Sequence, residues 1–212
     1  MRFRLLKFNQ VILVIIFAQF VFTVAASLSV PVFALFIVQD IGAAAAAVGF
    51  ASAIYWVVKS ILQLPIARWI DKNHGEIDDY YSLLIGIGIT TLGIFFMYFA
   101  EEVWHVFVIQ ALVAVGDAFA VPPLYAIFTR HIDSGSEGFE WTLQSSFSLG
   151  GGAALGGVLN GILVGLIGIR PLYLLNGTLM LIGWVILWFL RPYIRPKVPT
   201  LVGRVFLEQK RV

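Results

Sequence analysis

The sequence has no cysteine and few charged residues, and these two shortages exclude several classes of protein. Without cysteine, the 212-residue chain has no disulfide framework, no thiolate nucleophile and no cysteine metal site. Asp, Glu, Lys and Arg make up only 12% of the residues, about half the share found in a soluble domain. The net charge of +2 gives no indication of a nucleic-acid partner.

Apolar residues are what the chain has in excess. They make up 60% of it, and the mean hydropathy is +0.93. A hydrocarbon core about 30 Å thick needs about 20 apolar residues in a helix. Six runs are long enough, and they predict an all-α integral membrane protein with spans near residues 9–38, 44–69, 80–100, 103–129, 139–167 and 171–190. The first run could instead be a cleaved signal sequence, but its apolar continuation past Pro31 favours a span.

Positive charges predict the orientation of these spans. If six helices cross, nearly all Lys and Arg residues fall on one side of the membrane: Arg2, Arg4, Lys7, Arg68, Lys72, Arg130, Arg191, Arg195, Lys197, Arg204, Lys210 and Arg211. The other side has only Arg170. The positive-inside rule then places both termini in the cytoplasm. We therefore expect one six-helix domain over residues 1–191 and a basic cytoplasmic tail over residues 192–212.

The connection between the second and third spans resembles a known signature. The stretch "PIARWIDKNHGE" (65–76) is similar to the G-x-x-x-D-R/K-x-G-R-R motif of the major facilitator superfamily of transporters. Asp71 and Lys72 fall on its Asp and its basic residue, and Gly75 follows one residue after the position of its Gly. Ala67 and Glu76 depart from the motif. The alternative is a solvated turn between two helices.

Later segments resemble the same family in the same order. The fourth span has Gln110, Ala114 and Gly116 where the family has R-x-x-x-G-x-G, so the arginine that the family often uses in proton coupling is missing. The fifth, "SLGGGAALGGVLNGILVG" (148–165), resembles the G-x-x-x-G-P-x-x-G-G motif of exporters that run as antiporters. Its matching glycines are Gly152, Gly156, Gly157 and Gly161, with Gly157 in place of the proline and Asn160 in place of a glycine.

The resemblance implies one half of a twelve-helix transporter fold. Family members place the solute site between two six-helix halves that rock against each other. We therefore expect a parallel homodimer in the cell (inner) membrane that moves a small solute by alternating access, as a proton-coupled exporter of drug-like or amphiphilic compounds, with no cofactor. A non-transporting scaffold and the N-terminal half of a twelve-helix transporter remain alternatives. No catalytic constellation favours an enzyme.

Charged residues within the spans are the first candidates for a solute or coupling site. Lys59 and Asp117 are predicted at similar depth in the second and fourth spans. They form either a structural ion pair or a coupling pair in which Asp117 takes up a proton when Lys59 moves away. By the family resemblance, Gln19, Gln110 and Asn160 add hydrogen bonds in the same cavity.

Two further groups are predicted to control assembly and gating. Asp71, with Arg68, Lys72 and Gly75, is expected to form a cytoplasmic latch in which Arg68 holds Asp71 against the partner's fifth span. Small residues at four-residue spacing let membrane helices approach closely. The stripes Gly152–Gly156–Asn160 and Gly157–Gly161–Gly165 therefore predict close packing on two sides, with Gly156 at the dimer interface.

Overall fold

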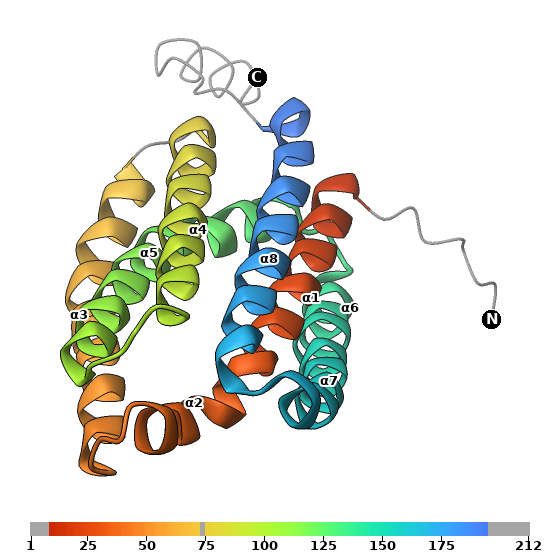
Figure 1. The fold of residues 1–212 in the computed structure, drawn as a ribbon. Helices are drawn as coiled ribbons and strands as arrows, with labels where there is room; N and C mark the ends of the chain where they lie inside the picture. Colours follow the sequence, from red (N-terminus) through yellow and green to blue (C-terminus); the bar gives the residue numbers. More distant parts are fainter. Residues whose placement is uncertain (1–8, 73–74, 195–212) are drawn as a thin grey trace, which may run out of the picture.

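The computed structural model describes residues 9–72 and 75–194, and these residues are almost entirely helical. Within them, six helical spans are long and apolar enough to cross a membrane: Gln10–Asp40, Ala46–Lys72, Ile77–Met97, Val103–His131, Glu137–Ile167 and Ile169–Tyr193. The predicted all-α class with six spans is confirmed. The first span begins and the last span ends at one end of the bundle, here called the terminal end (Figure 1). The opposite end is called the far end.

The start of the third span and the end of the sixth differ from the predicted ranges, and the local sequence explains both differences. The third span begins at Ile77 instead of near residue 80, because Asp78 and Asp79 occupy its first turn, where carboxylates face the unpaired amides of a helix N-terminus. The sixth continues as a 3-10 helix, Trp188–Tyr193, through Pro192. Most of the predicted basic tail, residues 195–212, lies outside the described residues.

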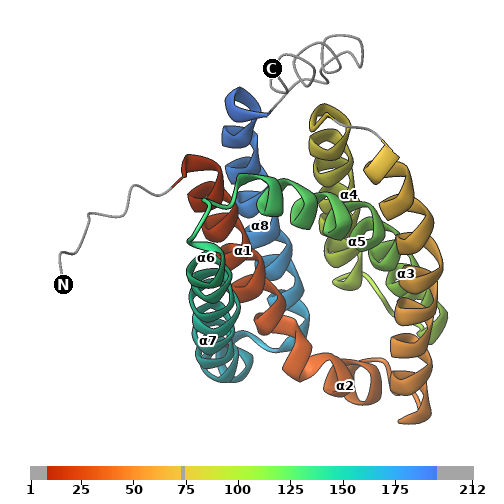
Figure 2. The same cartoon turned by 180° about the vertical axis from the view of Figure 1, so that it is seen from behind.

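The six spans pack as two groups of three. One group contains α3 (Ala46–Lys72), α4 (Ile77–Met97) and α5 (Val103–His131), and the other contains α1 (Gln10–Ser29), α7 (Gly152–Ile167) and α8 (Ile169–Leu187). Figures 1 and 2 show the groups side by side, and contacts between α4 and α8 join them. The molecule is therefore a bundle with a seam along its middle.

The first span bends where proline interrupts it. Helix α1 ends at Ser29, and a 3-10 turn (Val30–Val32) carries Pro31, which has no amide hydrogen to continue the helical ladder. The chain goes on as the short α2 (Phe33–Leu35) and a π-helical turn (Phe36–Asp40). Figure 1 shows this segment running across the far end from α1 to α3, so one span closes the bottom of the seam.

Helix α5 contains two prolines, and a neighbouring helix compensates for one of them. Pro123 cannot donate to the carbonyl of Phe119, four residues earlier. The hydroxyl of Ser82 on α4 donates to that carbonyl instead, at 2.9 Å. In a membrane each backbone group needs a protein partner, so this bond lets α5 keep Pro123 in its interior.

Glycines bring α4 and α5 into backbone contact. A Cβ atom on Gly86 would lie 2.6 Å from the Gly116 carbonyl oxygen and the Ala120 nitrogen. A Cβ atom on Gly116 would lie 2.7 Å from the Gly86 carbonyl oxygen. No side chain fits at either position, and the two helices cross at the shortest separation that their backbones allow. This crossing sets the position of Asp117, the residue after Gly116.

The fifth span presents a polar and small-residue stripe to α1. It consists of α6 (Glu137–Leu143), a π-helical segment (Gln144–Gly151) and α7. In an α-helix, residues four apart are rotated slightly past one full turn, so a stripe at this spacing drifts around the helix. A π-helix has more residues per turn, so the same spacing rotates the stripe in the opposite direction. Together the two segments therefore keep the stripe on the face that contacts α1. The stripe residues are Gln144, Ser148, Gly152, Gly156 and Asn160.

This stripe corrects the predicted role of Gly156. Its added Cβ would lie 2.5 Å from the Val24 carbonyl oxygen of α1, so Gly156 packs within the chain and is not at a surface for a second copy. Asn160 donates to the Leu28 carbonyl at 2.6 Å, and Ser148 donates to the Ile16 carbonyl at 2.8 Å. The other stripe, Gly157, Gly161 and Gly165, has no described residue within 4 Å of the positions a Cβ would take. Close packing is thus present on one side of α7 within the chain.

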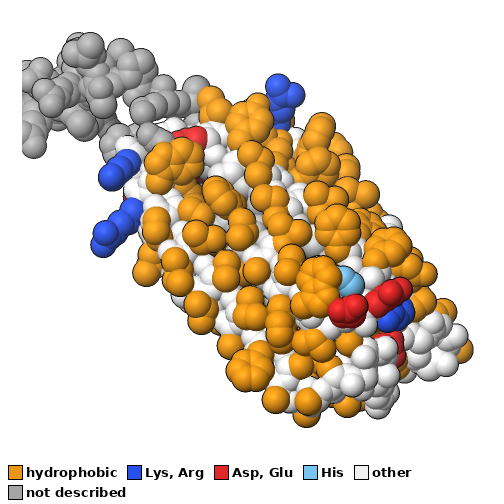
Figure 3. Space-filling model, turned by 60° about the vertical axis from the view of Figure 1, so that its left-hand side comes forward, with side chains coloured by type: hydrophobic (Ala, Val, Ile, Leu, Met, Phe, Trp, Pro, Cys, Tyr) orange, Lys and Arg blue, Asp and Glu red, His pale blue; other side chains and the backbone are white. Residues whose placement is uncertain are grey.

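Apolar side chains cover the flanks of the bundle. Figure 3 shows a hydrophobic surface with charged residues gathered at its two ends, as a protein surrounded by lipid requires. The second and fifth spans are the least buried of the six. Within residues 9–72 and 75–194, these two spans therefore leave the largest apolar faces uncovered.

Candidate functional site

A cavity of about 550 Å³ lies between the two groups of helices. Its walls come from α1, α3, α4, α5 and α8, and most of them are apolar. It contains a small number of polar groups, among them Asp117, Tyr55 and Thr90. A mostly apolar pocket with a few convergent polar groups is the usual form of a small-molecule site.

Asp117 is bound from two helices at once. The Tyr55 hydroxyl of α3 donates to its Oδ2 atom, and the Lys59 Nζ atom lies 3.4 Å from the same oxygen. The Thr90 hydroxyl of α4 donates to Oδ1 at 3.0 Å. Both carboxylate oxygens thus accept hydrogen bonds.

Lys59 occupies a site with the features of an ammonium pocket. Its Nζ atom donates to the Tyr55 hydroxyl at 2.9 Å. It also lies 5.2 Å from the centre of the Tyr55 ring and 5.4 Å from that of Trp56. A carboxylate with two aromatic rings is a favourable surrounding for an ammonium group.

The structure brings together most of the residues that we expected at a solute or coupling site. Lys59 and Asp117 are in contact, and Gln19 and Gln110 line the same cavity. Asn160 is not among the lining residues, because its side chain faces α1. Sequence reasoning did not identify Thr90 or Tyr55 as partners of Asp117. The spacing of Tyr55 four residues before Lys59 is the signal that links these two side chains on one helix face.

The predicted gate residues lie at the terminal end of α3, in two neighbouring surface pockets. Asp71 lines a pocket of about 460 Å³ together with Tyr125 and Arg130 of α5. Arg68 and Lys72 line the other. Among the ion pairs of the described residues there is none between Arg68 and Asp71, so the expected hold of Arg68 on Asp71 is absent. Gly75 is buried beside the two residues at 73–74 that lie outside the described part.

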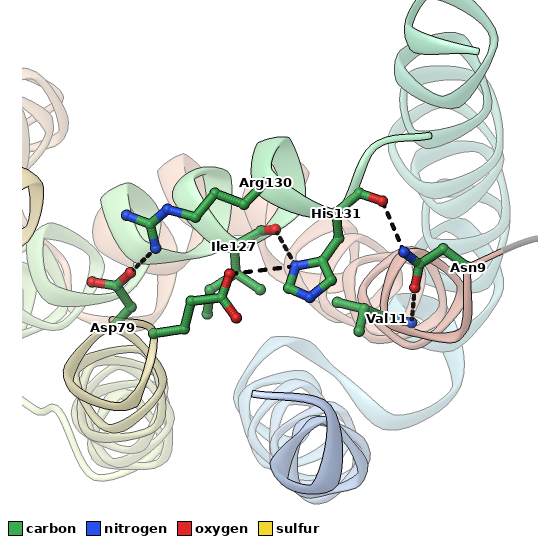
Figure 4. Close-up of polar contacts among 7 residues, drawn as sticks. Asn9, Val11, Asp79, Ile127, Arg130 and His131 are labelled. Atoms are coloured by element: carbon green, nitrogen blue, oxygen red, sulfur yellow. Dashed lines mark hydrogen bonds and ion pairs between the residues drawn. The ribbon is translucent and has the colours of Figure 1, made fainter. Parts of the chain in front are cut away.

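A second polar cluster lies at the terminal end and includes Arg130, which also lines the Asp71 pocket (Figure 4). Arg130 of α5 pairs with the fully buried Asp79 of α4. His131 Nδ1 lies 3.6 Å from the Glu76 carboxylate and 3.0 Å from the Ile127 carbonyl oxygen. Asn9 donates to the His131 carbonyl at 2.9 Å and also caps α1 by accepting from the Val11 amide. The cluster ties the start of α1 to α4 and α5.

His131 is a buried histidine at the end of a membrane span. It is the last residue of α5 and is only 5% exposed. The helix extends two residues beyond its predicted end, and the buried Glu76 carboxylate gives the imidazole a polar partner there.

Comparison with known proteins agrees with this architecture. A family model described as the Major Facilitator Superfamily matches residues 15–209, which is nearly the whole chain. The chain belongs to the major facilitator superfamily. No curated protein sequence matches it.

A solved major facilitator structure has the same fold. It is described as an in meso crystal structure of the POT family transporter PepTSo, with a TM-score of 0.73 and 18% sequence identity. The match covers 92% of this chain and 40% of that one, so the chain spans less than half the length of this solved relative. The protein is therefore a multi-pass membrane protein of a transporter family, with one six-helix unit in this sequence.

Proposed function

We propose that this major facilitator is a secondary active transporter that moves a small amphiphilic solute by alternating access, with proton coupling at Asp117. The observation that carries the proposal is the cavity itself. It contains a carboxylate, an ammonium and two hydroxyls within an apolar pocket of a transporter fold. Charges within membrane spans are costly and mark solute or ion pathways by default.

Flux measurement in vesicles tests this function. Purified protein in liposomes with an imposed proton gradient is expected to move an amphiphilic dye such as ethidium faster than protein-free vesicles do. Collapse of the gradient should abolish the difference. A panel of dyes and amphiphiles should also be tested. If none of them moves faster than in protein-free vesicles, the scaffold alternative is favoured, because a scaffold moves nothing.

We further propose that the transporting unit is a parallel homodimer. A cavity built from one six-helix unit lacks the second half that encloses the site in family members. The two least buried spans, the second and the fifth, supply apolar faces that a second copy would cover. If the chain is the N-terminal half of a longer transporter, the same faces would instead meet the other half of that protein.

The open glycine stripe of α7 predicts the contact. Gly161→Leu should weaken pairing, because a bulky side chain holds the two helices apart where small residues let them approach. Val185→Leu, which adds bulk to an exposed face of α8, is the matched control and should leave pairing unchanged. The monomer–dimer equilibrium in lipid at varied protein density measures both. A wild-type chain that is monomeric at every density would contradict the dimer.

Asp71 is proposed as a weak latch at the terminal end. A carboxylate near the N-terminus of a partner helix is favourable by about 0.3–1 kcal/mol, so Asp71→Asn should shift the ratio of inward-open to outward-open forms by roughly two- to fivefold. The accessibility of a single cysteine introduced at Gln110 reports this ratio without background, because the native chain has no cysteine. Asp78→Asn neutralises a charge at the same end and serves as the control. Equal shifts in both variants would refute a specific latch.

A further inference from the structure

Two buried polar atoms in the cavity wall have no hydrogen-bond partner within the described part of the chain. They are the Tyr173 hydroxyl and the Asn176 Oδ1 atom, both on α8. Tyr173 is 2% exposed and Asn176 is 1% exposed, and both line the same cavity as Asp117. The Asn176 amide nitrogen is already used, since it donates to the Ser29 hydroxyl at 2.6 Å.

Such atoms are rare, because a buried polar group without a partner destabilises the fold. A functional explanation is that a ligand supplies the partner. The Tyr173 hydroxyl can donate or accept, and the Asn176 oxygen can only accept. A group that both donates and accepts, such as a hydroxyl or a primary amide, would satisfy the two atoms together.

The other end of the cavity is suited to an ammonium group. The Lys59 ammonium contacts the Asp117 carboxylate and lies over the rings of Tyr55 and Trp56. A solute ammonium that displaces it would meet the same partners. Asp117 lies about four helical turns from the far end of α5, and Asn176 lies about two turns from the far end of α8. The two polar subsites are thus separated along the bundle by about two turns, on the order of 10 Å.

We propose that the cavity binds an aromatic amphiphile with an ammonium group at one end, at Asp117, and a hydroxyl or primary amide at the other, between Tyr173 and Asn176. The apolar walls between the subsites take the aromatic body. This assignment rests on the proposed function only in taking the bound compound to be the transported solute. Tyr173 and Asn176 then determine which amphiphiles bind.

A matched pair of probes tests the α8 subsite. In lipid nanodiscs, the para-hydroxy derivative of phenylbutylamine should bind about tenfold more tightly than phenylbutylamine itself, as expected for one added hydrogen bond in a site built to receive it. Tyr173→Phe and Asn176→Leu should each reduce that ratio towards one. Thr178→Val is the control, because the Thr178 hydroxyl is exposed and bonds the Leu174 carbonyl of its own helix.

Stability without ligand separates a binding role from a structural one. Tyr173→Phe removes a hydroxyl that has no partner, so the melting temperature of the unliganded protein should stay the same or rise. A clear fall would show that the hydroxyl serves the fold, for instance through an ordered water, and would overturn the subsite.

The ammonium subsite has its own test. Lys59→Met should raise the affinity for both probes about tenfold, because it removes the group that competes for Asp117 while Tyr55 and Thr90 still hold the carboxylate. Equal affinity of the two probes in the wild type, or binding of neither, overturns the proposed solute class even if ethidium flux is observed. Discrimination between the probes without any flux would support the solute class and refute transport.

Discussion

Gly116→Leu should lower the free energy of unfolding by about 3 kcal/mol or more. The new side chain would meet the Gly86 carbonyl oxygen and the Thr90 backbone nitrogen, whose distances from the added Cβ are both 2.7 Å. Backbone atoms cannot move aside as the tip of a side chain can, so α4 and α5 must separate along their whole contact. The separation would also withdraw Thr90 from Asp117 and reduce transport.

Unfolding in mixed micelles or thermal denaturation measures this effect. Gly49→Leu makes the same change at an exposed position of α3 with nothing within 4 Å, and it should cost less than about 1 kcal/mol. Similar losses in both variants would mean that the leucine acts through helix propensity or lipid contact and not through the α4–α5 crossing.

Asp117→Asn should abolish the pH dependence of transport while the protein stays folded. On the coupling hypothesis, Asp117 binds a proton when Lys59 moves away from it, and releases the proton when Lys59 returns. The asparagine keeps the size of the side chain but cannot exchange a proton at physiological pH. Its Oδ1 atom can still accept from one of the two hydroxyls, and its amide nitrogen can donate to the other. Flux measured across a series of pH values should therefore become flat. A folded Asp117→Asn protein with the wild-type pH profile would refute the assignment.

A purely structural ion pair predicts a different pattern of stability. In that case Lys59→Met or Asp117→Asn alone would cost about 3–5 kcal/mol by leaving one buried charge unpaired, and the double variant would recover most of the loss. On the coupling hypothesis the free energy of unfolding of each single variant stays close to that of the wild type. The reason is that Tyr55 and Thr90 remain as hydrogen-bond partners of the side chain at position 117. A double-mutant cycle on the free energy of unfolding distinguishes the two.

The fold could be predicted from local patterns along the chain. Span lengths follow from hydropathy, because a helix must satisfy its own backbone in lipid and the bilayer fixes how long it is. Motif order gave the family, since the stretches around Asp71, Gly116 and Gly152 occur in the expected sequence. The pairing of Lys59 with Asp117 was a reasonable hypothesis from equal depth, yet depth alone does not show which helices are neighbours.

The partners of individual side chains depended on helix rotation and crossing, which small differences in packing decide. Gly156 and Gly157 are adjacent in sequence and equally small, but one packs on α1 and the other has open space beside it. Which stripe packs within the chain depends on how the π-helical segment turns the fifth span. Similarly, Thr90 reaches Asp117 only because Gly86 and Gly116 let two backbones touch.

The sequence by itself therefore determined a six-span membrane protein, its family and the depth of its charged residues, because hydrophobicity and charge act on each segment separately. Only the tertiary structure decided that Tyr55 and Thr90 complete the Asp117 cluster and that Asn160 serves packing. It also decided that Tyr173 and Asn176, which line the cavity, have buried polar atoms without a partner among the described residues. These are contacts between segments far apart in the chain. Their geometry is fixed by close packing of whole helices, which no local pattern records.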